Sequence, residues 1–115
     1  MAVTINSVKE VRQANPGVRT LVVSVTLASS HQATLGDSVD LSAYTDKIFQ
    51  AMAHGVSAKV KWFNILETNF ATGKLNIKAF SAAAAVASAT NLTSVTASCM
   101  VWCRHPGAGV ELVLL

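Results

Sequence analysis

The residues best suited to chemistry lie in one short stretch of the chain. Positions 95–105 read V-T-A-S-C-M-V-W-C-R-H, so Cys99, Cys103 and His105 fall within seven positions. Thiolates and imidazoles are the ligands that zinc prefers, and two thiols can form a redox-active disulfide. Three interpretations therefore compete: a metal site, a redox pair, and a strand whose cysteines only pack in a core.

The pattern around the two cysteines favours the third interpretation. Apolar residues alternate with others, as in a β-strand that advances about 3.3 Å per residue and points alternate side chains to opposite faces. Cys99 and Cys103 would then share a face about 13 Å apart, whereas a disulfide needs Cα atoms within about 7 Å of each other. Val95, Ala97 and Val101 continue the same row. We expect both cysteines to be buried structural residues; a metal site would require that this segment is not a strand.

The opposite face of the same predicted strand has an unusual composition. It combines two hydroxyl groups with a methionine, a tryptophan and an arginine, at Thr96, Ser98, Met100, Trp102 and Arg104. Tryptophan and arginine are enriched at protein interfaces. Met100, Trp102 and Arg104 are therefore the candidate interface residues. The alternative is that a second sheet covers Met100 and Trp102.

The other residues that could do chemistry are scattered. His31 follows two serines and precedes Asp37 and Asp40, but no serine lies in a G-x-S-x-G sequence, and loops normally collect these residue types. The remaining histidines lie in separate loop regions and lack the HExxH spacing of zinc enzymes. Asp37, Asp40 and Asp46 do not follow the spacing of a calcium-binding EF-hand, and Asp40 is expected to begin a turn or a short helix. We predict no catalytic residue, no cofactor and no metal site.

The composition favours a protein whose surface is partly covered by neighbouring proteins. The 115 residues fit one domain spanning 1–115, and 51% are hydrophobic while only 13% are charged, against about 25% in a typical soluble domain. The net charge of +3 is mild, so we expect neither nucleic acid nor a membrane as partner. The sequence shows no signal-peptide pattern, and the apolar run 82–89 is far shorter than the roughly 20 residues that span a bilayer.

Short alternating segments separated by turn residues predict an all-β fold. Residues 18–28 alternate, with Leu21, Val23, Val25 and Leu27 on one face. The Asn15-Pro16-Gly17 turn should join them to residues 3–13 in a hairpin. Residues 29–44 read as a long exposed loop, and the short segment 48–53 is compatible with a strand or a turn of helix.

The second half of the chain contains another predicted hairpin. In 57–66, Val60 and Trp62 are expected on one face and the lysines at 59 and 61 on the other, with a bulge or a doubly buried strand at Phe63. After a turn at 71–73, three apolar residues should point inward: Leu75, Ile77 and Ala79. We expect loop with some strand over 81–89 and a strand over 93–104. The apolar V-E-L-V-L-L at 110–115 should pair within the domain or join a neighbour's sheet. Together these segments predict a single-domain β-sandwich or jelly-roll-like fold.

The order of these segments resembles a family of small tailed-phage virion proteins, the head decoration or cement proteins. The resembling stretches are T-L-V-V-S-V-T-L-A-S-S (20–30), G-D-S-V-D-L-S-A-Y (36–44), N-F-A-T-G-K-L-N-I-K-A-F (69–80) and T-N-L-T-S-V-T-A-S-C-M-V-W-C-R (90–104). They cover most of the chain and match in pattern rather than through a diagnostic motif. The sequence departs from the family pattern at H-Q-A-T-L (31–35), where relatives often have an aromatic residue, Pro and Gly.

The resemblance implies a β-sandwich without catalytic residues or cofactors, made in the host cytoplasm and located on the capsid surface of the virion. Such proteins bind the major capsid protein, often as homotrimers, and stabilise the shell against internal DNA pressure. One alternative is a tail or head–tail joining protein, which would form rings or tubes. Another is a monomeric ligand-binding β-sandwich that uses Trp62 or Trp102 as a stacking platform, for example for a carbohydrate.

Overall fold

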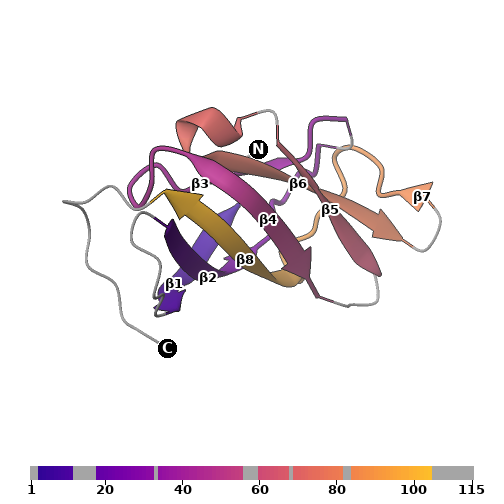
Figure 1. The fold of residues 1–115 in the computed structure, drawn as a ribbon. Coiled ribbons are helices and arrows are strands. Elements are labelled where there is room, and N and C mark those ends of the chain that lie inside the picture. Colours follow the sequence, from indigo (N-terminus) through magenta and orange to yellow (C-terminus); the bar gives the residue numbers. More distant parts are fainter. Residues whose placement is uncertain are drawn as a thin grey trace.

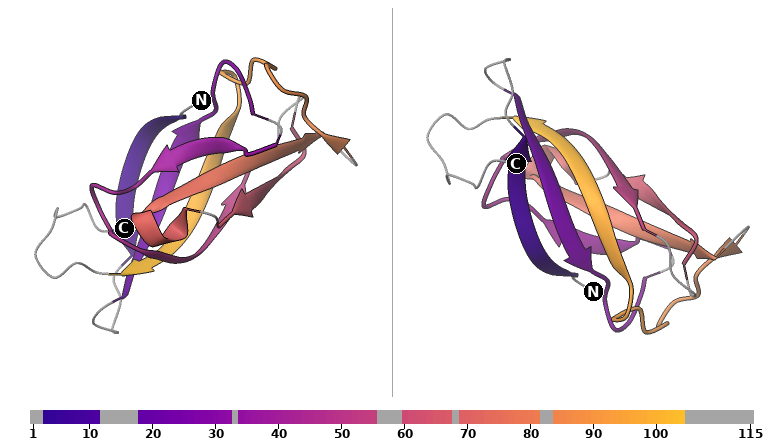
Figure 2. Two further views of the ribbon diagram at one scale, coloured as in Figure 1. Left: turned by 90° about the horizontal axis from the view of Figure 1, so that it is seen from above. Right: turned by 90° about the horizontal axis from the view of Figure 1, so that it is seen from below.

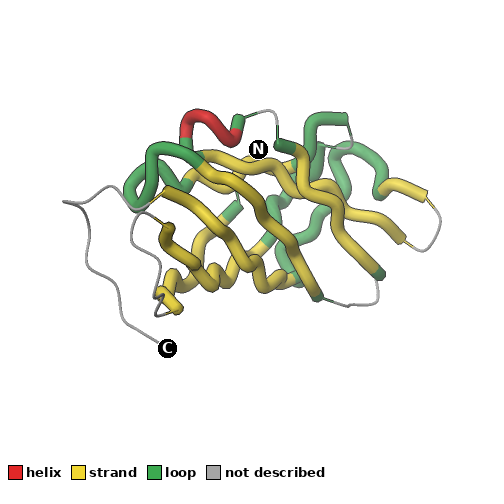
Figure 3. The backbone as a smooth tube through the Cα atoms, in the orientation of Figure 1, coloured by secondary structure: helices red, strands yellow, loops and turns green. Residues whose placement is uncertain are grey.

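A computed structural model describes residues 3–11, 18–32, 34–55, 60–67, 69–81 and 84–104. Most of them belong to strands, and one turn of 3₁₀ helix, η1 (Phe70–Thr72), is the helical segment in these ranges (Figure 3). The strands are β1 (Thr4–Val11), β2 (Val18–Thr26), β3 (Asp37–Asp40), β4 (Ile48–His54), β5 (Trp62–Leu66), β6 (Lys74–Ser81), β7 (Ala84–Ala85) and β8 (Thr96–Arg104). No helix in the described ranges is long and apolar enough to cross a membrane.

The strands form two antiparallel sheets that stack as two layers (Figures 1 and 2). The first, called the β8 sheet below, has the order β1-β2-β8-β4. The second, the β6 sheet, has the order β3-β6-β5, and β7 pairs with the end of β6. The predicted all-β sandwich is therefore confirmed.

The core lies between the two sheets and follows the predicted alternation. On β2, Leu21, Val23 and Val25 are fully buried, and each is paired in register with a buried residue of β8. From the other layer, the inward row of β6 is equally buried: Leu75, Ile77 and Ala79. Burying branched apolar side chains from both layers contributes roughly 1.5–3 kcal/mol per side chain. Both predicted hairpins, β1–β2 and β5–β6, are present, although the turn at 15–17 lies outside the described residues.

The expectation of a long exposed loop over 29–44 is wrong. Residues 37–40 form β3, which pairs with β6, and Val39 and Leu41 are fully buried. A four-residue strand offers too little alternation to be recognised, and its partner lies far along the chain. The expected turn after Asp40 is confirmed, because its Oδ1 accepts the Ser42 N–H at 2.9 Å and the Leu41 carbonyl accepts two later amides.

The expected arrangement of residues 57–66 is also wrong. Val60 is fully buried whereas Trp62 is 46% exposed, so the two do not share a face. The chain bends at Lys61, and β5 begins only at Trp62. From there the pairing with β6 is continuous and has no bulge at Phe63, which packs against the core. The lysine at 59 lies outside the described residues.

Both edges of the β8 sheet are interrupted by irregularities. The register shifts at Asn6 on β1 and at Phe49 on β4, where one extra residue enters each edge strand. Such bulges bend an edge and make it a poor template for another strand. The segment 48–53 is thus a strand rather than a helical turn, and 81–89 contains the short β7, as expected. Residues 110–115, predicted to form a strand, lie outside the described ranges.

Candidate interface on the outer face of the β8 sheet

The outer face of the β8 sheet is centred on Met100. Met100 lies opposite Val22 of β2 on one side and Met52 of β4 on the other. In an antiparallel sheet, paired residues point to the same face, so these three side chains form one apolar row. The next row places Trp102 between Thr20 and Gln50.

This face is not covered by the second sheet. The β6 sheet packs against the opposite face of β8, where Ala97, Cys99, Val101 and Cys103 are buried. Met100 is 37% exposed and Met52 is 58% exposed, while Trp102 is half-buried. Exposed methionines are adaptable contact residues, and tryptophan is a frequent interface anchor. The geometry is that of a surface available for contact, and the interface role of Met100, Trp102 and Arg104 stays a prediction.

Phe49 extends the apolar surface to the edge of the sheet. It is the extra residue of the β4 bulge and is 48% exposed. The ammonium nitrogen of Lys47 lies 5.9 Å from the centre of its ring, within the range of a cation–π contact. The sequence alone did not reveal either residue, because only the pairing of β4 with β8 places Met52 opposite Met100 and the Phe49 bulge near Trp102.

Arg104, the third candidate, is already paired. Its Nε and Nη2 donate to Asp46 Oδ1 and Oδ2 at 2.9 and 2.7 Å in a bidentate contact. The hydrogen bond from Arg104 lowers the pKa of Asp46, and the same contact raises the pKa of Arg104. Both side chains stay more than half exposed. Asp46 thus orients the guanidinium at the rim of the face, where a partner would meet an ion pair rather than a lone cation.

The two cysteines are buried on the core side of β8, as predicted, and both are free. Burial raises the pKa of Cys99 to about 12 and also raises the pKa of Cys103. The Cys103 thiol donates to the Arg19 carbonyl at 3.3 Å. Thiols held in the protonated form neither attack substrates nor bind metals. Within the described residues, no group of three or more His, Cys, Asp or Glu side chains could hold a metal ion.

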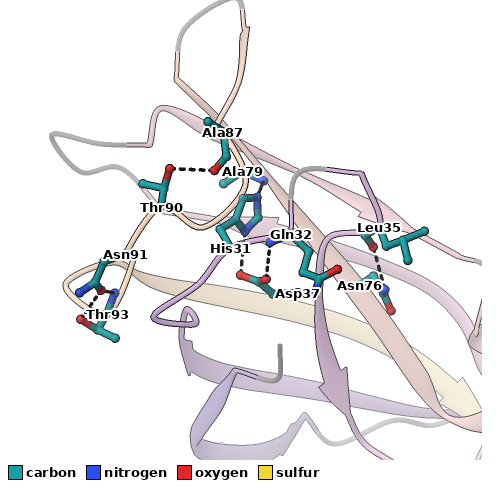
Figure 4. Close-up of polar contacts among 10 residues, drawn as sticks. All are labelled: His31, Gln32, Leu35, Asp37, Asn76, Ala79, Ala87, Thr90, Asn91 and Thr93. Atoms are coloured by element: carbon teal, nitrogen blue, oxygen red, sulfur yellow. Dashed lines mark hydrogen bonds and ion pairs between the residues drawn. The ribbon is translucent and has the colours of Figure 1, made fainter.

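His31 and Asp37 form a buried pair that the sequence did not reveal (Figure 4). His31 Nδ1 lies 2.7 Å from Asp37 Oδ2, and neither side chain is exposed. The Ala79 N–H donates to His31 Nε2 at 3.3 Å, so Nε2 must be the unprotonated nitrogen and Nδ1 the donor to Asp37. The other carboxyl oxygen of Asp37 accepts the Gln32 N–H at 3.0 Å.

The His31–Asp37 pair joins several segments of the fold. Its side chains link the loop after β2 to β3 and β6, and the His31 backbone bonds to Ala89 and Thr90 in the loop before β8. A His–Asp pair resembles part of a catalytic triad, but this one is closed to solvent and its ring nitrogens are both engaged. The geometry gives His31 a structural role, and the absence of catalysis at this residue stays a prediction.

Comparison with known proteins adds no assignment: no family model, curated protein or solved structure matches the chain.

Proposed function

We propose that this protein is a structural virion component that binds the outside of a phage capsid and stabilises it by bridging major capsid protein subunits, as a homotrimer. The observation that supports the proposal most directly is the outer face of the β8 sheet, where Met52, Met100, Trp102 and Phe49 remain accessible. The β-sandwich fold and the resemblance in segment order agree with it.

The low charge of the chain supports the same proposal. Only 13% of the residues are charged, whereas a free monomer generally keeps more charge for solubility. A contiguous exposed apolar face on such a protein is typical of a contact surface. Because the opposite face of β8 forms the core, a partner can bind the outer face without disturbing the fold.

The proposed mechanism is mechanical. Each copy buries apolar side chains against its neighbours, and each contact raises the free energy needed to separate capsid subunits. Many copies on one shell act together, so contacts that are weak individually hold strongly through multivalency.

The test has two parts, an assembly measurement and a binding measurement. Light scattering on a sizing column, in reducing buffer over a range of concentrations, should give a mass near three times the 12.0 kDa of the chain. Met100→Glu and Trp102→Ala should weaken trimer formation or binding to undecorated heads by at least about tenfold, as expected for central contact residues. Leu35→Glu, at a residue that is 64% exposed elsewhere on the molecule, is the matched control.

Other outcomes point to the alternatives. Rings or tubes would favour a tail or head–tail joining protein. A monomer at every concentration that also fails to bind undecorated heads would contradict the proposal. Ligand-dependent tryptophan fluorescence in that monomer would favour a ligand-binding module.

A further inference from the structure

A second exposed aromatic group lies on the other layer of the sandwich, at the end of the β6 sheet marked by β7 in Figure 1. Trp62 of β5 is paired in register with Phe80 of β6. Their ring centroids are 3.9 Å apart and the rings are nearly parallel, at 6°. Trp62 is 46% exposed and Phe80 is half-buried. The stacked pair is a preformed flat apolar surface, whose rings lose little freedom when a partner binds.

One lysine lies over this pair, and another directly precedes Trp62 in the chain. Lys78 precedes Phe80 by two residues and therefore shares its face of the strand, and its Nζ lies 5.7 Å from the centre of the Phe80 ring. Lys61 is exposed beside Trp62, and its backbone N–H donates to the Phe80 carbonyl at 2.8 Å. We call Lys61, Trp62, Lys78 and Phe80 the aromatic–lysine patch.

The lysines of the patch have no ion pair with a carboxylate among the residues that the structure describes. Four of the carboxyl groups in these ranges contact groups elsewhere: Glu10, Asp37, Asp40 and Asp46. The exposed Glu67 is five residues from Trp62, or about 16 Å along an extended chain. The patch therefore combines an apolar surface with positive charge that the described fold does not neutralise.

We propose that the aromatic–lysine patch binds an acidic segment of a protein partner in which carboxylates flank an aromatic side chain. Its carboxylates pair with Lys61 and Lys78, and its apolar side chain packs on the Trp62–Phe80 stack. Two lysines match one or two carboxylates, whereas a nucleic-acid-binding groove follows the phosphate backbone with more positive charge than two lysines provide. In protein interfaces, a central tryptophan commonly supplies much of the affinity, and charges at the rim guide the partner into position. The patch combines a tryptophan and two lysines that can serve in these two ways.

The patch and the Met100 face lie on different sheets, on outer faces that point away from each other. One molecule can therefore use both surfaces at once, which would let it connect two neighbours. The inference goes beyond the proposed function and does not depend on it, because binding of an acidic segment can be measured on the isolated protein.

The experiment follows the indole N–H signal of Trp62 by NMR in the full chain, with the two tryptophan signals assigned through Trp102→Phe. The probe is a capped peptide of sequence EEFEEF, and the control peptide is QQFQQF. We expect a saturable shift of the Trp62 signal with the acidic peptide and at least about tenfold weaker binding of the neutral one. Raising the salt concentration should weaken the binding of the acidic peptide.

Variants of the chain distinguish binding at the patch from non-specific attraction to the positive charge of the protein. The double variant Lys61→Glu/Lys78→Glu should lose at least about tenfold in affinity. Lys74→Glu, on the same strand but opposite Asp40 in the β3 pairing, is the matched control and should bind within about twofold of the original chain.

Three results with the peptides would overturn the inference. They are the absence of a saturable Trp62 shift at millimolar peptide, equal binding of the neutral peptide, and full binding by the double variant. Tighter binding of a thymidine oligonucleotide than of the acidic peptide would also overturn it and assign the patch to single-stranded nucleic acid. None of these results depends on trimer formation or on Met100→Glu, so a failure here is distinguishable from a failure of the proposed capsid function.

Discussion

At the scale of single residues, the buried contact between His31 and Asp37 makes the sharpest prediction. His31→Ala removes the partners of Asp37 Oδ2 and of the Ala79 N–H, both buried, and should lower the free energy of unfolding by about 3–5 kcal/mol. Urea titration followed by circular dichroism measures the loss. His54→Ala, at an exposed histidine at the end of β4, should change stability by less than about 0.5 kcal/mol.

Equal effects of the two substitutions would contradict the structural role of His31. So would a chain that carries His31→Ala, keeps its stability and loses a measurable activity, because that result would identify His31 as a catalytic residue.

Residues whose burial follows from strand alternation were predictable from the sequence, and residues whose neighbours depend on register were not. The burial of Cys99 and Cys103 follows from one strand alone. The proximity of Met52 to Met100 requires the pairing of β4 with β8. The same limit hid the His31–Asp37 pair, because its geometry depends on β3, a strand too short to recognise in the sequence.

At the scale of elements, the β5–β6 hairpin depends on Gly73. Gly73 ends η1 with φ of 78°, and a Cβ at this position would lie 2.5 Å from the Thr45 carbonyl oxygen. Gly73→Ala would combine left-handed strain with a backbone clash, and it should lower the free energy of unfolding by about 2–4 kcal/mol. The midpoint of urea unfolding measures the change.

Ala89→Gly is the matched control for this prediction, because Ala89 is a non-glycine residue with φ of 66°. Glycine at that position relieves the left-handed strain, so stability should stay the same or rise by up to about 1 kcal/mol. A loss at position 89 as large as that of Gly73→Ala would contradict the role given to left-handed strain, and unchanged stability in Gly73→Ala would contradict the clash with Thr45.

Elements with clear alternation or clear turn residues were predicted well, and irregular ones were not. The inward row of β6 follows from the sequence because polar and apolar residues alternate from Lys74 to Ala79, and the turn before it is marked by Gly73. The prediction that Val60 and Trp62 share a face was wrong because the chain bends at Lys61 before β5 begins. The bulge at Phe49 has no signature in a seven-residue strand.

At the scale of the whole molecule, the arrangement leaves two outward surfaces of different character around one core. The Met100 face is apolar with an ion pair at its rim, and the aromatic–lysine patch is flat and cationic. Bulges at both edges of the β8 sheet disfavour growth by strand addition there. For the β8 sheet, contacts through its outer face rather than through its edges are therefore expected.

The same core predicts how the stability of the whole molecule depends on pH. Burial raises the pKa of Cys99 from 9.0 to about 12, so the unfolded chain releases this proton at a lower pH than the folded chain does. The thiol's contribution to folding is then complete below pH 9 and decreases as the pH rises towards 12, by about 1.4 kcal/mol per pH unit. Urea unfolding from about pH 8 to about pH 11 in reducing buffer should show this decline, and Cys99→Ala should make it shallower. Val101→Ala is the control, because it creates a cavity on the same buried row without removing a thiol. It should lower stability at every pH and leave the slope of stability against pH unchanged. An unchanged slope in Cys99→Ala would show that the thiol is not the cause.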